Sequence, residues 1–142
     1  MKLPDTNVLV YAANLAAPQH AAALRWLKGA FDAPQGVALT WMALLGFVRL
    51  TTHPAILSSP LAVEDALRAI NQWLTEPAAQ VVHPGPQHAA LLGRFLVAAG
   101  TGGNLTSDAH LAALAFEHGA TVGTFDKDFR RFAGVSVELL KA

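Results

Sequence analysis

Short apolar runs alternate along the chain with longer segments in which apolar residues recur every three or four positions. Runs of the first kind predict buried strands, and the longer periodic segments predict helices. The predicted strands are Lys2–Pro4, Val37–Thr40, Gln80–His83, Ala120–Thr124 and Val135–Val137. The predicted helices are Thr6–Asn14, His20–Phe31, Trp41–Thr52, Pro60–Thr75, Pro86–Ala99 and Ser107–His118, with a helical turn at Asp126–Phe132. Strands that alternate with helices predict an α/β fold, in which helices cover both faces of a parallel sheet.

Two of these helices carry further signals. The segment Trp41–Thr52 is apolar around nearly its whole circumference, which predicts a buried helix. The segment Ser107–His118 is the clearest helix, because Ser107 is a favoured capping residue and Gly119 stands just past its end.

Length and composition narrow the class of protein. A chain of 142 residues predicts a single domain, residues 1–142. Hydrophobic residues make up 53% and charged residues 14%, which excludes a disordered chain and leaves apolar surface for a partner. The absence of cysteine excludes disulfides, thiolate zinc sites and a cysteine nucleophile, and it fits a reducing, cytoplasmic setting. Neither a signal peptide nor a membrane span is expected.

The charges balance, with ten basic and ten acidic residues. A strongly cationic nucleic-acid binder shows a basic excess, so neutrality weakens a model of binding by bulk electrostatics. It leaves room for a small basic rim around an acidic site.

Aspartates stand at three predicted helix starts: Asp5, Asp108, and Asp126 with Asp128 two residues further on. Taken singly, each is explained by helix capping, by the helix dipole or by a turn. Taken together, they would converge at one edge of a parallel sheet, where their repulsion requires a cation. Ligands that are all oxygen point to Mg²⁺ or Mn²⁺, which would support hydrolysis of a phosphodiester.

Four segments in this order resemble one family along essentially the whole chain. They are Asp5–Ala12, Leu45–Leu50, Asn104–Ala115, and Asp126–Phe129 followed by Phe132. The chain is similar in these segments to the VapC-type PIN-domain toxin ribonucleases of bacterial toxin–antitoxin pairs. The resemblance implies a three-layer α/β/α sandwich, Mg²⁺-dependent cleavage of RNA, a small VapB-like antitoxin that inserts near the active site, and a homodimer.

Carried over by position, the resemblance makes Asp5, Asp108 and Asp126 the metal carboxylates. Asp128 becomes a nearby fourth carboxylate that acts through water. Asn7 and Thr6 become hydrogen-bonding supports of the first carboxylate.

Two departures from the family pattern bear on the site. Many members carry a glutamate in the middle helix shortly before the arginine, whereas Trp41–Thr52 contains no acid, so the number of metal ions stays open. Phe125 stands where a small hydroxyl residue is common, and Thr124 is the candidate to supply that hydroxyl instead. Arg49 is expected either to bind a phosphate or to serve as a snorkelling surface residue or the partner of an aspartate within the chain.

Two other functions remain open. The missing glutamate is compatible with a degraded PIN-like module that binds RNA or the antitoxin without cleavage. A receiver-like phosphoacceptor domain also gathers aspartates at strand ends. It usually has paired acids after the first strand, whereas Thr6 and Asn7 follow Asp5 here, so the receiver interpretation is disfavoured.

Overall fold

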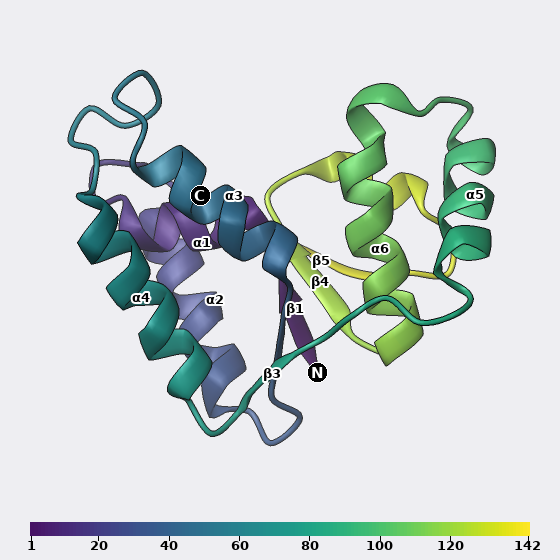
Figure 1. Ribbon diagram of the computed structural model, residues 1–142, viewed down its shortest axis with the longest axis horizontal. Coiled ribbons are helices and arrows are strands. Elements are labelled where there is room, and N and C mark those ends of the chain that lie inside the picture. The colour runs from purple at the N-terminus through teal and green to yellow at the C-terminus, as the bar shows by residue number, and fades with distance from the viewer.

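A computed structural model describes residues 1–142. Its centre is a five-stranded sheet in the order β3-β2-β1-β4-β5, and all four pairs of neighbouring strands are parallel (Figure 1). The strands are β1 (Lys2–Pro4), β2 (Val37–Leu39), β3 (Ala79–Val81), β4 (Thr121–Thr124) and β5 (Ser136–Leu139). The predicted parallel sheet is therefore confirmed.

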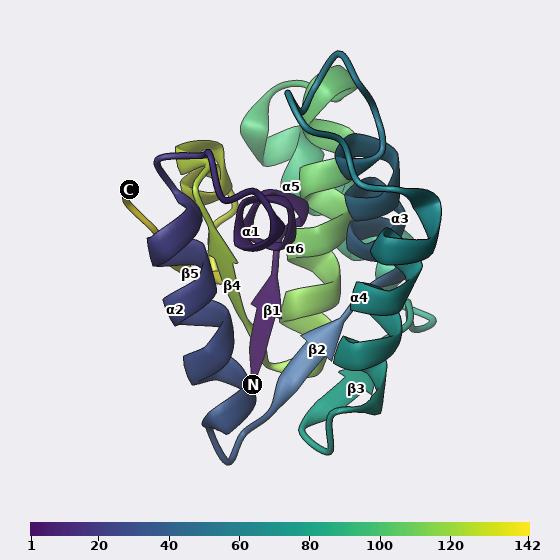
Figure 2. The same cartoon turned by 90° about the vertical axis from the view of Figure 1, so that its left-hand side faces the viewer.

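Helices form a layer on each side of the sheet. The helices are α1 (Thr6–Ala13), α2 (His20–Asp32), α3 (Trp41–Thr51), α4 (Val63–Thr75), α5 (His88–Ala99) and α6 (Thr106–His118), with 3-10 turns η1 (Gly103–Leu105) and η2 (Lys127–Arg131). Figure 1 shows α1 to α4 on one side of the strands and α5 and α6 on the other, and Figure 2 looks onto the side of α1 to α4. The predicted three-layer α/β/α sandwich is confirmed.

The alternation of side chains along β2 shows why both faces need a cover. Val37 and Leu39 belong to the apolar core beneath α1 to α4, whereas Ala38 belongs to the core beneath α5 and α6. Leu3 and Val122, on β1 and β4, point into the same core as Ala38. Successive side chains of a strand point to opposite faces, so short apolar runs bury themselves only between two helical layers.

For α3 and α6, one detail each of the sequence-based prediction is wrong. Helix α3 is not buried all round, because Trp41 is 45% and Leu45 62% exposed. Ser107 does not cap α6, since the helix starts at Thr106 after the turn η1, and no side chain caps it. Gly119 does end α6 as predicted, in a left-handed conformation with φ 63°.

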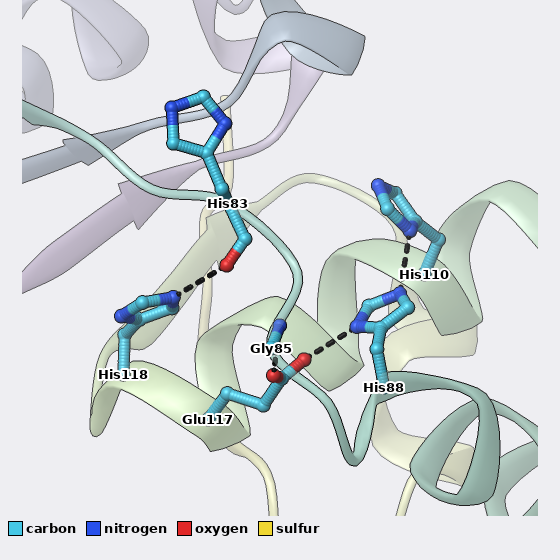
Figure 3. Close-up of polar contacts among 6 residues, drawn as sticks. All are labelled: His83, Gly85, His88, His110, Glu117 and His118. Atoms are coloured by element: carbon cyan, nitrogen blue, oxygen red, sulfur yellow. Dashed lines mark hydrogen bonds and ion pairs between the residues drawn. The ribbon is translucent and has the colours of Figure 1, made fainter.

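Helix α5 is fastened to α6 by a cluster of polar side chains (Figure 3). His88 lies between Glu117 and His110: its Nδ1 bonds the carboxylate, and its Nε2 lies 2.7 Å from Nδ1 of His110. The backbone N–H of Gly85 donates to Glu117 at 2.7 Å, and His118 donates to the carbonyl of His83 at 3.0 Å. Although burial raises the pKa of Glu117, the hydrogen bonds from His88 and Gly85 lower it overall. The cluster therefore ties the loop after β3 and both helices together.

The longest helices, α2, α4 and α6, have 13 residues each. About 20 apolar residues are needed to cross a bilayer, and no helix here meets the length and apolarity of a membrane span.

Candidate active site

The candidate site lies where the parallel strands β1 and β4 end side by side. Pro4 pairs with Gly123 in register, and the backbone N–H of Asp5 donates to the carbonyl of Gly123 at 2.9 Å. Asp5 and Thr124 therefore stand beside each other, although 119 positions separate them in the chain. Their neighbourhood follows from the carboxyl ends of parallel strands meeting at one sheet edge.

Asp5 is the most tightly held of the predicted carboxylates and is only 8% exposed. Its Oδ1 accepts from the backbone N–H of Thr6 at 2.7 Å, which caps α1. Its Oδ2 accepts from the hydroxyl of Thr124 at 2.7 Å and from the amide of Asn7 at 3.1 Å. Burial raises the pKa of Asp5; the hydrogen bonds from Thr124 and Thr6 oppose this rise, and Asp126 adds to it.

Asn7 and Thr124 form the frame behind this carboxylate. The Asn7 amide donates to the Thr124 hydroxyl at 3.2 Å, and its carbonyl oxygen accepts from the backbone N–H of Phe125 at 3.2 Å. Thr124 also accepts from the backbone N–H of Asp126 at 3.0 Å, so its hydroxyl joins the two aspartates. The hydroxyl expected near Phe125 is present one position earlier, and it contacts Asp5.

Asp126 is held by the turn that it starts. One carboxylate oxygen accepts from the backbone N–H of Asp128 at 2.9 Å, which caps η2. The capping explanation is therefore correct for both Asp5 and Asp126. It does not compete with a role in a site, because each side chain also lines the groove described below.

Asp108 differs from the other two because it caps no helix. It lies in the first turn of α6, and its pKa is raised to about 7. Burial is the largest cause, followed by the charges of Asp5, Asp126 and Asp128. Carboxylates close enough to shift one another in this way repel unless protons or a cation neutralise them.

A groove of about 440 Å³ contains most of the predicted site residues. Its lining includes Asp5, Thr6, Asn7, Arg49, Asp108 and Asp126. Thr124 and Asp128 are not among the lining residues. The Thr124 hydroxyl donates to Asp5, and the backbone N–H of Asp128 donates to Asp126. The methyl group of Thr6 faces α3, since a Cβ on Gly46 would lie 2.8 Å from it, so the support that Thr6 gives Asp5 comes from its backbone.

Arg49 is the basic side chain of the groove. None of the ion pairs of the chain includes it; they are Lys2–Glu138, Arg68–Asp65 and His88–Glu117. The interpretation of Arg49 as the partner of an aspartate is therefore wrong. Arg49 is an exposed residue in the same groove as three carboxylates, and its guanidinium is free to bind an anion such as a phosphate.

The sequence did not reveal the apolar part of the groove. Its further lining residues are Val10, Tyr11, Asn14, Leu50, Ile56 and Leu57. Asn7, Tyr11 and Asn14 follow one another at the spacing of one helix face. This spacing is a signal that could have pointed to Val10, Tyr11 and Asn14 as lining residues. Ile56 and Leu57 lie in the turn after α3, where no sequence pattern points to them.

The donor set fits a hard divalent cation, because every candidate ligand is a carboxylate oxygen. No group of three or more acidic or imidazole side chains converges closely enough to hold a metal ion unaided. Mg²⁺ normally keeps several waters and binds proteins through one or two carboxylates together with substrate phosphates. An incomplete carboxylate set beside an open groove is therefore compatible with such an ion.

Comparison with known proteins identifies the family. Residues 2–135 match the PIN domain family. Ribonuclease VapC37 of Mycobacterium tuberculosis is 47% identical over 135 residues, which cover 95% of this chain and 94% of the relative. Ribonuclease VapC33 of the same organism is 36% identical over 133 residues, 94% and 93% of the two chains. The chain belongs to the PIN-domain family and within it to the VapC ribonucleases.

Solved structures support the fold. VapC20 of Mycobacterium tuberculosis, described as a sarcin–ricin loop cleaving toxin, superposes with a TM-score of 0.70 at 20% identity, over 95% of this chain and 96% of that one. VapBC2 of Rickettsia felis, bound to a promoter DNA fragment, gives a TM-score of 0.72 at 17% identity, over 99% and 98% of the chains. These likenesses confirm the fold, whereas the family match and the sequence relatives confirm the predicted family resemblance.

Proposed function

We propose that this chain is the toxin of a toxin–antitoxin pair and hydrolyses phosphodiester bonds of RNA in the cytoplasm with the help of a divalent cation. The observation that carries the proposal is that Asp5, Asp108 and Asp126 line one groove. Burial and then the charges of the neighbouring carboxylates raise the pKa of Asp108 to about 7. Ribonuclease VapC37, which is 47% identical over 135 residues, supports the choice of RNA.

In this proposal, Asp5, Asp108 and Asp126 would hold Mg²⁺, or Mn²⁺ in its place, together with water and the substrate phosphate rather than as a closed set of three direct ligands. A bound ion of this kind lowers the pKa of a water molecule and neutralises charge on a phosphate. Thr124 and Asn7 keep the Asp5 carboxylate oriented through bonds of 2.7 and 3.1 Å. None of these side chains has to act as a covalent nucleophile.

Two charged residues complete the proposed chemistry. Arg49, which lines the same groove, binds the phosphate, since guanidinium geometry suits phosphate oxygens. Asp128 stands behind Asp126 and acts on the ion through water and through its charge on Asp108. Because α3 supplies no carboxylate, one ion rather than two is the simpler expectation.

The proposed partners are a VapB-like antitoxin and a second copy of the chain. VapBC pairs among the structural neighbours support the first. The exposed side chains of Trp41 and Leu45, one turn apart on α3, support the second, because such apolar surface is typical of interfaces. Size-exclusion chromatography with light scattering tests the dimer: Leu45→Ser should yield a monomer, and a monomeric parent protein would remove this proposal.

The central experiment incubates the antitoxin-free protein with structured and unpaired RNAs in Mg²⁺, Mn²⁺ or a chelator. Cleavage should require the metal and should be lost in Asp108→Asn and in Asp5→Asn, while circular dichroism shows both variants folded. Retained cleavage in both variants would reject the proposed site. If the folded protein binds neither ion by titration calorimetry, the degraded module that binds RNA or antitoxin without cleavage becomes the better description.

A further inference from the structure

The groove that holds the carboxylates continues along α1 as an apolar channel. Asp5 caps the start of α1, and Asn14 caps its end. At 1.5 Å per residue, about 13 Å of helix separates them. Between these caps, Val10 and Tyr11 line the groove together with Ile56 and Leu57 of the turn after α3.

An aromatic contact fixes the position of Tyr11. Its ring meets the ring of Phe125 edge to face, with centroids 5.2 Å apart at 84°. Phe125 is held in turn, because its backbone N–H donates to Asn7 at 3.2 Å. The aromatic residue at the position where the family commonly has a hydroxyl therefore supports Tyr11 beside the carboxylates.

The chemistry of the channel suits a nucleobase rather than the RNA backbone. Arg49 is the only basic side chain in the lining, so the groove provides for few phosphates. Apolar and aromatic walls suit the flat face of an unpaired base, which stacks on such side chains in single-stranded RNA. The Asn14 carbonyl oxygen accepts from the backbone of Ala16 at 3.3 Å, which leaves its amide N–H groups to donate to a base edge.

We propose that the channel formed by Tyr11, Asn14 and Ile56 is a subsite for the unpaired base of the nucleotide next to the cleaved phosphate. Phe125 is its positioning residue, because it acts through Tyr11. The inference rests on the proposed ribonuclease function and adds that the substrate must present this nucleotide unpaired.

The test uses a randomised pool of unpaired 12-nucleotide RNAs and sequencing of the cleaved ends. The parent protein should show a base preference at one position beside the cut. Ile56→Ser should relax this preference and lower kcat/KM about tenfold, the size of one lost base-stacking contact. Ile56 is 54% exposed, so its replacement leaves the fold intact. Val97→Ser, at an 82% exposed residue of α5, is the matched control and should retain both preference and rate.

A second set of variants separates positioning from stability. Tyr11→Phe keeps the aromatic ring that forms the wall of the channel. Phe125→Ser removes the contact that supports this ring. The Phe125→Ser variant should therefore relax the base preference, with cleavage still dependent on metal. An identical preference in the parent, Ile56→Ser and Phe125→Ser would overturn the subsite. Loss of cleavage in Asp108→Asn with no effect at Ile56 would leave the ribonuclease proposal standing and reject only the subsite.

A binding measurement decides the case if the pool is not cleaved. Fluorescence anisotropy in the Asp108→Asn background compares the unpaired 12-nucleotide pool with the same pool in duplex form. Weaker binding of the duplex, and about tenfold weaker binding of the single strand by Ile56→Ser, would support the subsite. Equal binding of both forms would overturn it, as would an Ile56→Ser variant that loses affinity for the antitoxin but not for RNA.

Discussion

Replacing Asp108 with asparagine should stabilise the metal-free protein. In the folded chain the pKa of Asp108 is raised from 3.8 to about 7, first by burial and then by Asp5, Asp126 and Asp128. Between these pH values the folded protein holds a proton that the unfolded chain has released. The free energy of unfolding therefore falls as the pH rises from about 4 to 7 and stays low above 7. An asparagine side chain at this position does not titrate, so the variant should not show this fall in the free energy of unfolding.

The magnitude follows from the same shift. A change from 3.8 to about 7 corresponds to about 4 kcal/mol. Solvent screening at this half-buried side chain reduces the effect. The expected gain in the free energy of unfolding of Asp108→Asn is therefore about 1–2 kcal/mol at pH 8, or roughly 3–8 °C in Tm. Near pH 4 the gain should vanish.

Urea denaturation in a chelator, at several pH values between 4 and 8, measures the gain directly. Asp32→Asn is a suitable control, since Asp32 is an exposed aspartate at the end of α2, outside the groove. It should show no gain that grows with pH. A gain for Asp108→Asn that is the same at pH 4 and pH 8, or a loss of stability at pH 8, would refute the argument from crowded carboxylates.

Three further predictions concern metal binding and packing. Mg²⁺ should raise Tm in thermal scans more at pH 8 than at pH 5.5, because the ion competes with the proton on Asp108; equal shifts would argue against binding there. Thr124→Val should lower the free energy of unfolding by about 1–3 kcal/mol in urea denaturation, since the Thr124 hydroxyl donates to Asp5 at 2.7 Å. The same variant should bind Mg²⁺ more weakly in calorimetry. Unchanged Mg²⁺ binding would make the role of Thr124 structural only. Gly123→Ala should lower the free energy of unfolding, measured by urea denaturation, by about 3 kcal/mol, because the new Cβ would lie 2.2 Å from the Trp26 ring. A 2.7 Å hydrogen bond to Glu138 holds that ring in place. A loss below about 1 kcal/mol would show that the ring can move.

Much of the fold could be predicted because its signals are local. The strand Lys2–Pro4 was predicted with the bounds that it has, and the predicted helix His20–Phe31 ends one residue early. The predicted helix Pro60–Thr75 starts three residues too early, since Val63 is its first helical residue. Apolar periodicity locates the middle of an element well, whereas its ends depend on backbone hydrogen bonds that the pattern does not contain.

The candidate site divides in the same way. The sequence by itself determined the aspartates as candidates, because each marks the start of a helix or turn, and the family motif Asp5–Ala12 adds Asn7. Only the tertiary structure decided that Asp108 would be crowded, because its pKa depends on burial and on carboxylates that lie far before it and well after it in the chain.

The apolar channel was decided by the tertiary structure alone. Tyr11 shares a helix face with Asn7, but Ile56 belongs to a loop, and no sequence pattern shows that Ile56 lines the same groove as Tyr11. The parallel order of β1 and β4 places Phe125 against Tyr11, although the two residues stand near opposite ends of the chain. Local sequence patterns determine which elements form, but the packing of distant elements determines which side chains share a cavity. A substrate-binding channel therefore emerges only when the sheet and its helices have assembled.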